Sequence, residues 1–224
     1  MSSSFGLTMP KAVIFDWDST LAENWGAVGR SINATLSEFN QPTWGEAELR
    51  HRAKGSARDT FPILFGGEWE AALAFFYAKF EEFHVAEVKA LPGAAEMLEA
   101  MHLQGVPVSL VSNKTGKFLR AEVSALGWND WFLNVIGAAD AERDKPAPDP
   151  VYLALAGAKT DAGPDVWFVG DAVPDLECAH HASCVPILMQ GGSITAEELE
   201  QWPPQAVFPS CRTLRDAFMH CAIA

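Results

Sequence analysis

The sequence has no apolar stretch as long as the roughly 18 residues that a membrane-spanning helix needs. Its first residues lack the basic region followed by an apolar one that is typical of a secretory signal peptide. The four cysteines show no C-x-x-C spacing, which favours reduced thiols over a metal site or a disulfide framework. We therefore expect a cytoplasmic protein that does not associate with a membrane.

Basic residues are also scarce. The chain has 16 Lys and Arg against 29 Asp and Glu, a formal net charge of −13. Binding to a phosphate backbone needs clustered Lys and Arg side chains, so a nucleic-acid partner is not expected. The same shortage disfavours a small anionic substrate, unless cations are concentrated at one place in the fold. No feature of the sequence predicts an oligomeric state.

Short apolar runs alternate with helical patterns along most of the 224 residues. Continuous apolar runs bounded by polar residues are typical of parallel strands that are covered on both faces. The expected strands are residues 11–16, 106–113, 131–138, 165–171, 185–189 and, more weakly, 206–208. Alternation of strands and helices at this spacing predicts an α/β protein with a Rossmann-like, doubly wound parallel sheet.

The interval 22–90 departs from this alternation, because it contains helical patterns and no clear strand. A crossover between parallel strands needs only about a dozen residues. We therefore predict a helical cap domain at 22–90, inserted into a core domain made of 1–21 and 91–224. Ligands of open α/β sheets bind at the carboxyl ends of the strands, so a cap that leaves directly after the first strand is expected to lie over the ligand site.

Polar side chains follow four of the expected strands. They are Asp16 and Asp18 after the first, Ser112, Asn113 and Lys114 at the end of the second, Lys145 in the loop after the third, and Asp171 and Asp175 after the fourth. An isolated D-x-D after a strand is most often a turn or a helix cap. Carboxylates, a hydroxyl and lysines that meet at one sheet edge instead indicate a binding or catalytic site.

These segments, in the order "DWDST", "SNK", an isolated Lys145 and "GDAVPD", resemble the four motifs of the haloacid dehalogenase (HAD) superfamily. The chain is most similar to the phosphatases of that superfamily that carry a helical cap, including phosphoglycolate phosphatase-like members. Ser19 is a departure, because many members have glycine there, and Trp17 occupies a position that is often aliphatic.

The resemblance implies a phosphatase with Mg²⁺ as cofactor. Asp16, Asp171 and the backbone carbonyl of Asp18 would bind the ion, and Asp175 would orient Lys145 or the ion's water shell. Asp16 would be the nucleophile and form an aspartyl-phosphate, and Asp18 would be the general acid and then the base. Lys145 would neutralise Asp16 and the substrate phosphate. Mg²⁺ and Lys145 together would make the cleft locally positive, which reconciles an acidic protein with an anionic substrate.

The phosphate oxygens would be held by Ser112 and by backbone N–H groups near Trp17 and Asn113. The expected substrate is a small phosphorylated metabolite, with phosphoglycolate as the first candidate. The cationic segment 51–59 of the expected cap is either a solvated helix end or a specificity element, in which Lys54 or Arg58 would reach an anionic group of the substrate.

Two other functions remain open at this point. A sugar phosphomutase would keep the same two aspartates and return the phosphoryl group to its substrate. A catalytically silent binding protein is disfavoured by the intact set Asp16, Asp18, Lys145 and Asp171. A dehalogenase is also disfavoured, since it needs neither the acid at Asp18 nor the metal ligand at Asp171.

Overall fold

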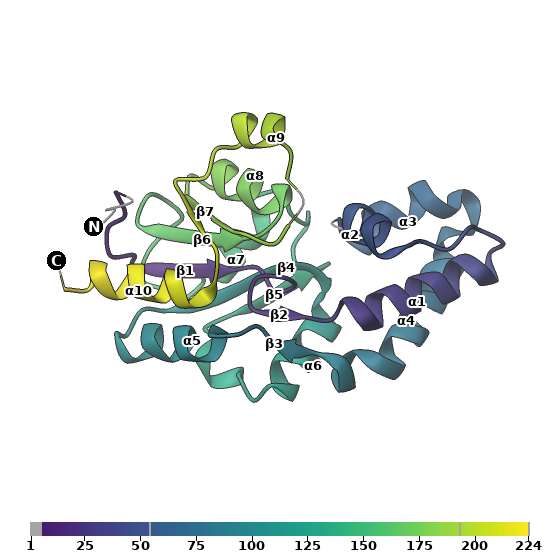
Figure 1. Cartoon of the computed structure of the whole chain (residues 1–224), viewed down its shortest axis with the longest axis horizontal. Coiled ribbons are helices and arrows are strands. Elements are labelled where there is room, and N and C mark those ends of the chain that lie inside the picture. The colour runs from purple at the N-terminus through teal and green to yellow at the C-terminus, as the bar shows by residue number, and fades with distance from the viewer. Residues whose placement is uncertain (1–5, 54, 193, 224) are drawn as a thin grey trace.

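The computed structural model describes residues 6–53, 55–192 and 194–223, and a six-stranded parallel sheet lies at its centre (Figure 1). The strand order is β5-β4-β1-β6-β7-β8. The strands are β1 (Ala12–Phe15), β4 (Val108–Thr115), β5 (Val135–Ala138), β6 (Val166–Gly170), β7 (Val185–Met189) and β8 (Ala206–Phe208). The predicted doubly wound α/β fold is therefore confirmed.

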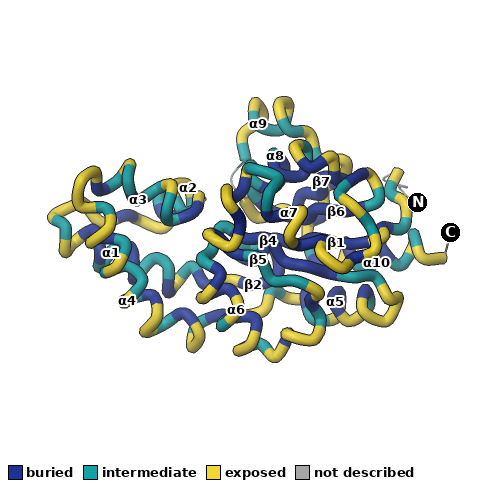
Figure 2. Tube along the Cα trace, turned by 180° about the vertical axis from the view of Figure 1, so that it is seen from behind, coloured by how far each residue is buried: buried dark blue, intermediate teal, exposed yellow. Residues whose placement is uncertain are grey.

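Strand β1 is buried on both faces because helices cover both sides of the sheet (Figure 2). Val13 and Phe15 point into one apolar cluster, and Ala12 and Ile14 point into another. The first cluster is completed by α5 (Ala94–Leu103), α6 (Gly116–Ala125) and α10 (Cys211–Cys221), and the second by α7 (Asp149–Ala154) and α8 (Val173–His181). A continuous apolar run is thus required in β1, in agreement with its sequence.

One strand and two helices differ from the sequence-based expectation. The predicted strand 131–138 is shorter, because Asn129–Trp131 form the 3₁₀ turn η2 and β5 begins at Val135. The helices α9 (Ala196–Gln201) and α10 were not anticipated. Ser210 caps the start of α10, because its side chain accepts a hydrogen bond from the backbone N–H of Thr213. The helix covers the sheet beside α5.

The expectation that residues 22–90 contain no strand was wrong at both ends of the interval. Strands β2 (Ala22–Glu23) and β3 (Lys89–Ala90) pair antiparallel. Two-residue strands are too short to produce an alternating pattern, so sequence periodicity does not reveal them. Their pairing brings the two ends of the interval together beside β1.

The helices between β2 and β3 lie to one side of the sheet and pack on one another (Figure 1). They are α1 (Trp25–Glu38), α2 (Glu46–Arg52), α3 (Ala57–Phe65), η1 (Gly66–Glu68) and α4 (Trp69–Glu87). Their own apolar cluster includes Ile32, Trp44 and Phe61. This separate cluster supports our proposal that 22–90 form a cap on a core made of 1–21 and 91–224. We use the name cap for these helices below.

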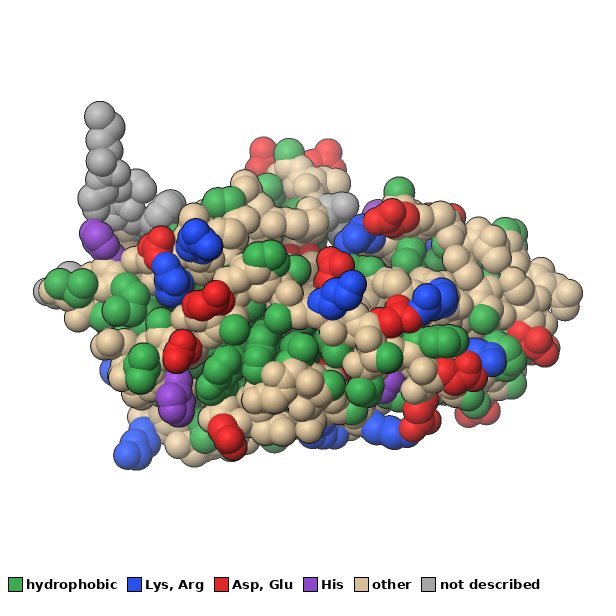
Figure 3. Space-filling view, turned by 60° about the horizontal axis from the view of Figure 1, so that its bottom comes forward, with side chains coloured by type: hydrophobic (Ala, Val, Ile, Leu, Met, Phe, Trp, Pro, Cys, Tyr) green, Lys and Arg blue, Asp and Glu red, His purple; other side chains and the backbone are tan. Residues whose placement is uncertain are grey.

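None of the described helices combines the length and the apolar composition that a membrane span requires. On the face shown in Figure 3, acidic and basic side chains are interspersed, and no large area is basic alone.

Gly137 in β5 is required for close packing against the start of α6. A Cβ atom at this position would overlap backbone atoms of Gly116 and Lys114. Because the overlap involves backbone rather than the end of a flexible side chain, the neighbours cannot give way without moving β4 or α6.

Gly137→Ala is therefore expected to destabilise the protein by about 1–3 kcal/mol, the usual effect of overpacking. Gly163→Ala is the matched control, because a Cβ there meets no atom within 4 Å, and it is expected to change stability by no more than about 0.5 kcal/mol. Urea unfolding followed by circular dichroism measures both values. Equal stabilities of the two variants would contradict the packing described here.

Candidate active site

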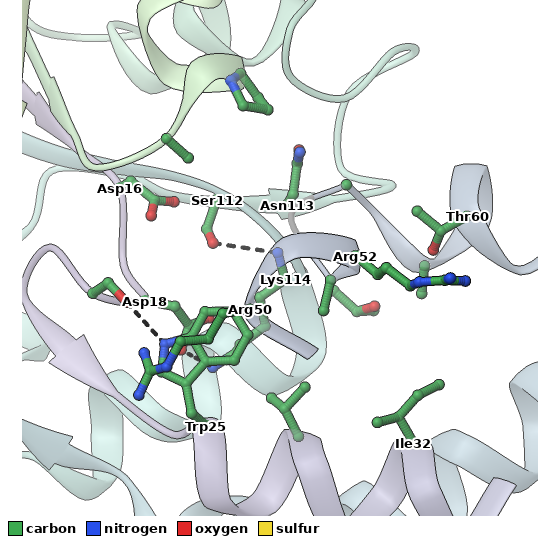
Figure 4. A pocket seen from close by; sticks show the side chains of 18 of the residues that line it. Asp16, Asp18, Trp25, Ile32, Arg50, Arg52, Thr60, Ser112, Asn113 and Lys114 are labelled. Carbon is green, nitrogen blue, oxygen red and sulfur yellow. Dashed lines mark hydrogen bonds and ion pairs between the residues drawn. The ribbon is translucent and has the colours of Figure 1, made fainter. Parts of the chain in front are cut away.

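The carboxyl ends of three adjacent strands bring the predicted site residues together (Figure 4). Asp16 follows β1, Ser112 lies near the end of β4, and Asp171 follows β6. The Asp16 backbone N–H donates to the carbonyl of Val169 at 2.8 Å, which extends the β1–β6 ladder by one residue and fixes the backbone at Asp16. Strands β4 and β5 lie on one side of β1, and β6, β7 and β8 lie on the other. A point where the strand order switches sides in this way forms the ligand crevice of an open α/β fold.

Lys145 is a buried cation of this crevice. Its Nζ lies 2.6 Å from Oδ1 of Asp16 and 2.6 Å from Oδ1 of Asp175. Burial works against the charged lysine, but the charges and hydrogen bonds of the two aspartates outweigh it and raise the pKa of Lys145. Lys145 is therefore a permanent positive charge that holds Asp16 and Asp175 in place.

Asp16, Asp171 and Asp175 form a buried carboxylate cluster. Each residue contributes one oxygen to a group of atoms that lie within 4.8 Å of one another. When all three are ionised, they carry three negative charges against the single positive charge of Lys145. Like charges so close together in a buried site are unfavourable unless a further cation balances them.

Burial and this charge imbalance both raise pKa values in the cluster. Burial raises the pKa of Asp171 to about 8, and the charges of Asp175 and Asp16 add to the shift. Burial also raises the pKa of Asp175 to about 6, although Lys145 opposes that change. Within the described part of the chain, no donor forms a hydrogen bond to the Asp171 carboxylate. Buried carboxylate oxygens without a donor suit a hard divalent cation, so these residues fit a metal ion.

Asp18 lies in a different environment, close to Asp16 in sequence but bound to a different lysine. Its Oδ1 is 2.9 Å from Nζ of Lys114 (Figure 4). Burial raises the pKa of Asp18 to about 6, and Lys114 limits the shift. The two carboxylates of the D-x-D motif are thus held by two separate lysines, so Asp16 and Asp18 can differ in protonation state and in chemical role.

The turn after Asp18 explains the departure at Ser19. Ser19 has a φ of 63°, in the left-handed region that favours glycine. Its Oγ accepts a hydrogen bond of 2.8 Å from Nε1 of Trp25, the first residue of α1. The serine therefore costs about 1 kcal/mol of backbone strain and gains a contact with the cap that glycine cannot make.

Of the three residues predicted to hold phosphate, two line the cavity and the side chain of the third does not. Ser112 and Asn113 line the cavity above Asp16. The Trp17 side chain is fully buried away from the cavity, where its Nε1 donates to Oε2 of Glu122 at 2.7 Å. Trp17 can therefore contribute to a ligand site only through its backbone, as the sequence-based prediction stated.

A cavity of about 160 Å³ lies between the strand ends and the cap. Its cap wall is largely apolar and aromatic, and includes Trp25, Ile32, Trp44, Phe61, Phe76 and Tyr77. The cations on that wall, among the residues described, are Arg50 and Arg52. Arg50 lies over the Trp25 ring, with 5.3 Å between its Cζ and the ring centroid.

Of the two cap cations proposed from sequence, Arg58 is not part of this wall. Arg58 donates from Nε to Oδ2 of Asp144 at 2.6 Å and from Nη2 to the carbonyl of Glu142 at 3.2 Å. It thus joins the cap to the loop that carries Lys145, and it does not line the cavity. Lys54 lies outside the described residues.

Sequence reasoning missed Arg50 and Glu122. Arg50 carries no signal that separates it from other basic residues of the cap. Glu122 does have one, because it lies three residues after Leu119 and one before Val123 on the buried face of α6. A charged residue on an apolar helical stripe is unusual and marks a specific partner.

Several known proteins resemble this chain in sequence. The model of the family described as haloacid dehalogenase-like hydrolase matches residues 13–188. The chain is 27% identical over 220 residues to a phosphoglycolate phosphatase of Rhodospirillum rubrum, covering 93% of this chain and 90% of that protein. It is 26% identical over 232 residues to a phosphoglycolate phosphatase of Escherichia coli, covering 92% of each.

A solved structure described as a haloacid dehalogenase-like hydrolase of Bacteroides fragilis has the same fold. The TM-score is 0.84 at 20% sequence identity, and the match covers 92% of this chain and 99% of the other.

Two adjacent glycines beside Asp171 provide a test of the carboxylate cluster. A Cβ at Gly192 would overlap the Asp171 carbonyl oxygen, whereas a Cβ at Gly191 would lie 3.9 Å from its nearest neighbour, the Ser19 carbonyl. Gly192→Ala is therefore expected to displace Asp171 and to weaken Mg²⁺ binding by roughly 10–100-fold, as disturbed outer contacts of metal sites do. Gly191→Ala should bind Mg²⁺ as the wild type does. Titration calorimetry measures both affinities, and equal affinities would contradict a role for Asp171 at the metal.

Proposed function

The chain belongs to the haloacid dehalogenase-like hydrolase family, and we propose that it is a magnesium-dependent phosphatase that hydrolyses a small phosphomonoester through an aspartyl-phosphate on Asp16. The observation that carries this proposal is the separation of the two motif carboxylates, with Asp16 bound to Lys145 and Asp18 bound to Lys114. A nucleophile and a proton donor must differ in charge state at the same pH, and two different surroundings allow this.

Mg²⁺ would be held by Asp16, Asp171 and the backbone carbonyl of Asp18, with Asp175 next to it. The fit of the carboxylate cluster to a hard cation supports this assignment. When bound, the ion would neutralise part of the phosphate charge that otherwise repels a carboxylate nucleophile. Lys145 supplies a second positive charge at Asp16.

The first step breaks the bond between phosphorus and the leaving oxygen. A carboxylate oxygen of Asp16 attacks phosphorus, and Asp18 donates its proton to the leaving alkoxide. Ser112 and the backbone N–H groups near Trp17 and Asn113 would hold the remaining phosphate oxygens, while Lys145 balances their charge. The product alcohol leaves with the proton from Asp18.

The second step regenerates the enzyme. The ionised Asp18 takes a proton from a water molecule, whose oxygen attacks the phosphorus of the aspartyl-phosphate. The bond between phosphorus and Asp16 breaks, and inorganic phosphate is released. Asp18 thereby recovers the proton that it lost in the first step.

We propose phosphoglycolate, or a phosphorylated metabolite of similar size, as the substrate. The names of the two relatives and the cavity of about 160 Å³ support a small molecule. Arg50 and Arg52, which line the cap wall and pair with Glu46 and Glu48 of α2, are the cations that we propose for a substrate carboxylate. They take the place of Arg58, which does not line the cavity. A role for Lys54 and a cytoplasmic location stay predictions.

The experiment that tests this proposal traps the phosphoenzyme. Asp16→Asn keeps the side-chain shape but removes the nucleophile, so no covalent phosphate should form. Asp18→Asn leaves the nucleophile intact and removes the base for the second step, so the aspartyl-phosphate should accumulate. Rapid quenching after mixing with para-nitrophenyl phosphate and Mg²⁺, followed by intact mass measurement, distinguishes the two.

Turnover gives an independent measure. Asp18→Asn is expected to lower kcat for an alkyl phosphate such as phosphoglycolate by roughly 10²–10⁴-fold, the usual contribution of general acid–base catalysis. A phosphate adduct on Asp16→Asn, or wild-type turnover by either variant, would overturn the division of roles.

A further inference from the structure

Glu122 is a fully buried carboxylate on α6 that the proposed mechanism does not use. It receives hydrogen bonds from Trp17 Nε1 at 2.7 Å, Asn24 Nδ2 at 2.8 Å and Lys114 Nζ at 2.6 Å, and His84 Nδ1 lies 3.2 Å from its Oε1. Although burial opposes its charge, these partners keep the pKa of Glu122 below its usual value. An ionised group in an apolar interior is costly and needs a reason.

The donors to Glu122 come from segments that meet at the base of the cap. Trp17 lies between the two motif aspartates, Asn24 directly precedes α1, and His84 lies in the last turn of α4. Asn24 Nδ2 also donates to the backbone carbonyl of His84 at 2.8 Å. One carboxylate thus joins the catalytic loop to both connections of the cap.

Lys114 extends this network to Asp18. Its Nζ contacts Oε2 of Glu122 at 2.6 Å and Oδ1 of Asp18 at 2.9 Å, and it lies 5.6 Å from the centroid of the Phe80 ring. The Lys114 side chain is only 6% exposed. An ammonium group held between two carboxylates and an aromatic ring has little freedom, so the position of Glu122 determines the position of Lys114.

We propose that Lys114 and Glu122 are positioning residues for Asp18, and that they set its carboxylate relative to the base of the cap. This inference rests on the proposed function, because it concerns the residue that transfers the proton. Lys114 at the end of β4 provides the contact to Asp18. Glu122 on α6 binds Lys114 from the side away from the cavity and keeps its ammonium group from turning toward the phosphate site or the solvent.

A displaced Asp18 should slow the reactions that need its proton and spare those that do not. Lys114→Met removes the ammonium at nearly constant length, and Glu122→Gln removes the charge that holds it. Each variant is expected to lower kcat/KM for phosphoglycolate by roughly 10–100-fold, because a misplacement of about 1 Å has this effect. The value for para-nitrophenyl phosphate, whose leaving group needs no proton, should fall by less than about threefold.

The chain offers a matched control pair between α6, the helix of Glu122, and α4, the helix of His84. Lys117 of α6 and Glu81 of α4 form an exposed ion pair at 2.6 Å. Lys117→Met and Glu81→Gln remove an ammonium group from α6 and a carboxylate charge from α4, and neither residue contacts Asp18. Both should leave the two kcat/KM values unchanged. Urea unfolding of each variant, with kinetics recorded well below the midpoint, separates misplacement of Asp18 from loss of the fold, and Lys114→Met keeps the test valid if Glu122→Gln does not fold.

A double-mutant cycle decides whether Lys114 acts through Asp18. If it does, adding Lys114→Met to Asp18→Asn should cause no further loss on phosphoglycolate, because the group being positioned is already absent. Multiplied losses, or an equal loss of kcat/KM on both substrates with a raised KM, would mean that Lys114 binds the phosphate directly and would overturn the inference. Wild-type kinetics of Lys114→Met would overturn it as well. If Asp18→Asn itself shows no dependence on the leaving group, the proposed function fails instead.

Discussion

The buried ammonium of Lys145 is the interaction on which the site depends. It joins Asp16 at the end of β1 to Asp175 in α8 with two contacts of 2.6 Å. Without it, the three clustered carboxylates would have no positive charge among them, and the pKa values of Asp171 and Asp175, already raised by burial, would rise further. The parallel sheet brings these residues to one edge, and the charge of Lys145 lets them remain there.

A second lysine allows the two motif aspartates to take different roles. Lys114 binds Asp18 and leaves Asp16 to Lys145, so two carboxylates separated by one residue have different partners. Glu122 then connects Lys114 to the base of the cap. In the account proposed here, the nucleophile is fixed by the core, whereas the proton donor is fixed by a network that includes both connections of the cap.

The sequence predicted the features that depend on local patterns. Apolar runs located β1, β4, β6 and β7, because fully buried strands leave no polar alternation, and four motifs predicted the family that the comparison confirms. Features set by tertiary contact were missed. The β2–β3 pair is too short for a pattern, the partner of Arg58 is 86 residues away, and the partners of Glu122 become neighbours only when the cap folds back.

The central claim is that a divalent cation balances the excess negative charge of the carboxylate cluster. The free energy of unfolding as a function of Mg²⁺ concentration tests it most directly. The account predicts that Mg²⁺ stabilises the wild type, by about 2.7 kcal/mol at a concentration of 100 Kd. Asp171→Asn should be at least as stable as the wild type in chelator, because it removes a buried carboxyl group whose ionised form is unfavourable in the folded protein, and Mg²⁺ should leave its stability unchanged. A wild type that Mg²⁺ does not stabilise, or an equal response of both proteins, would contradict the account.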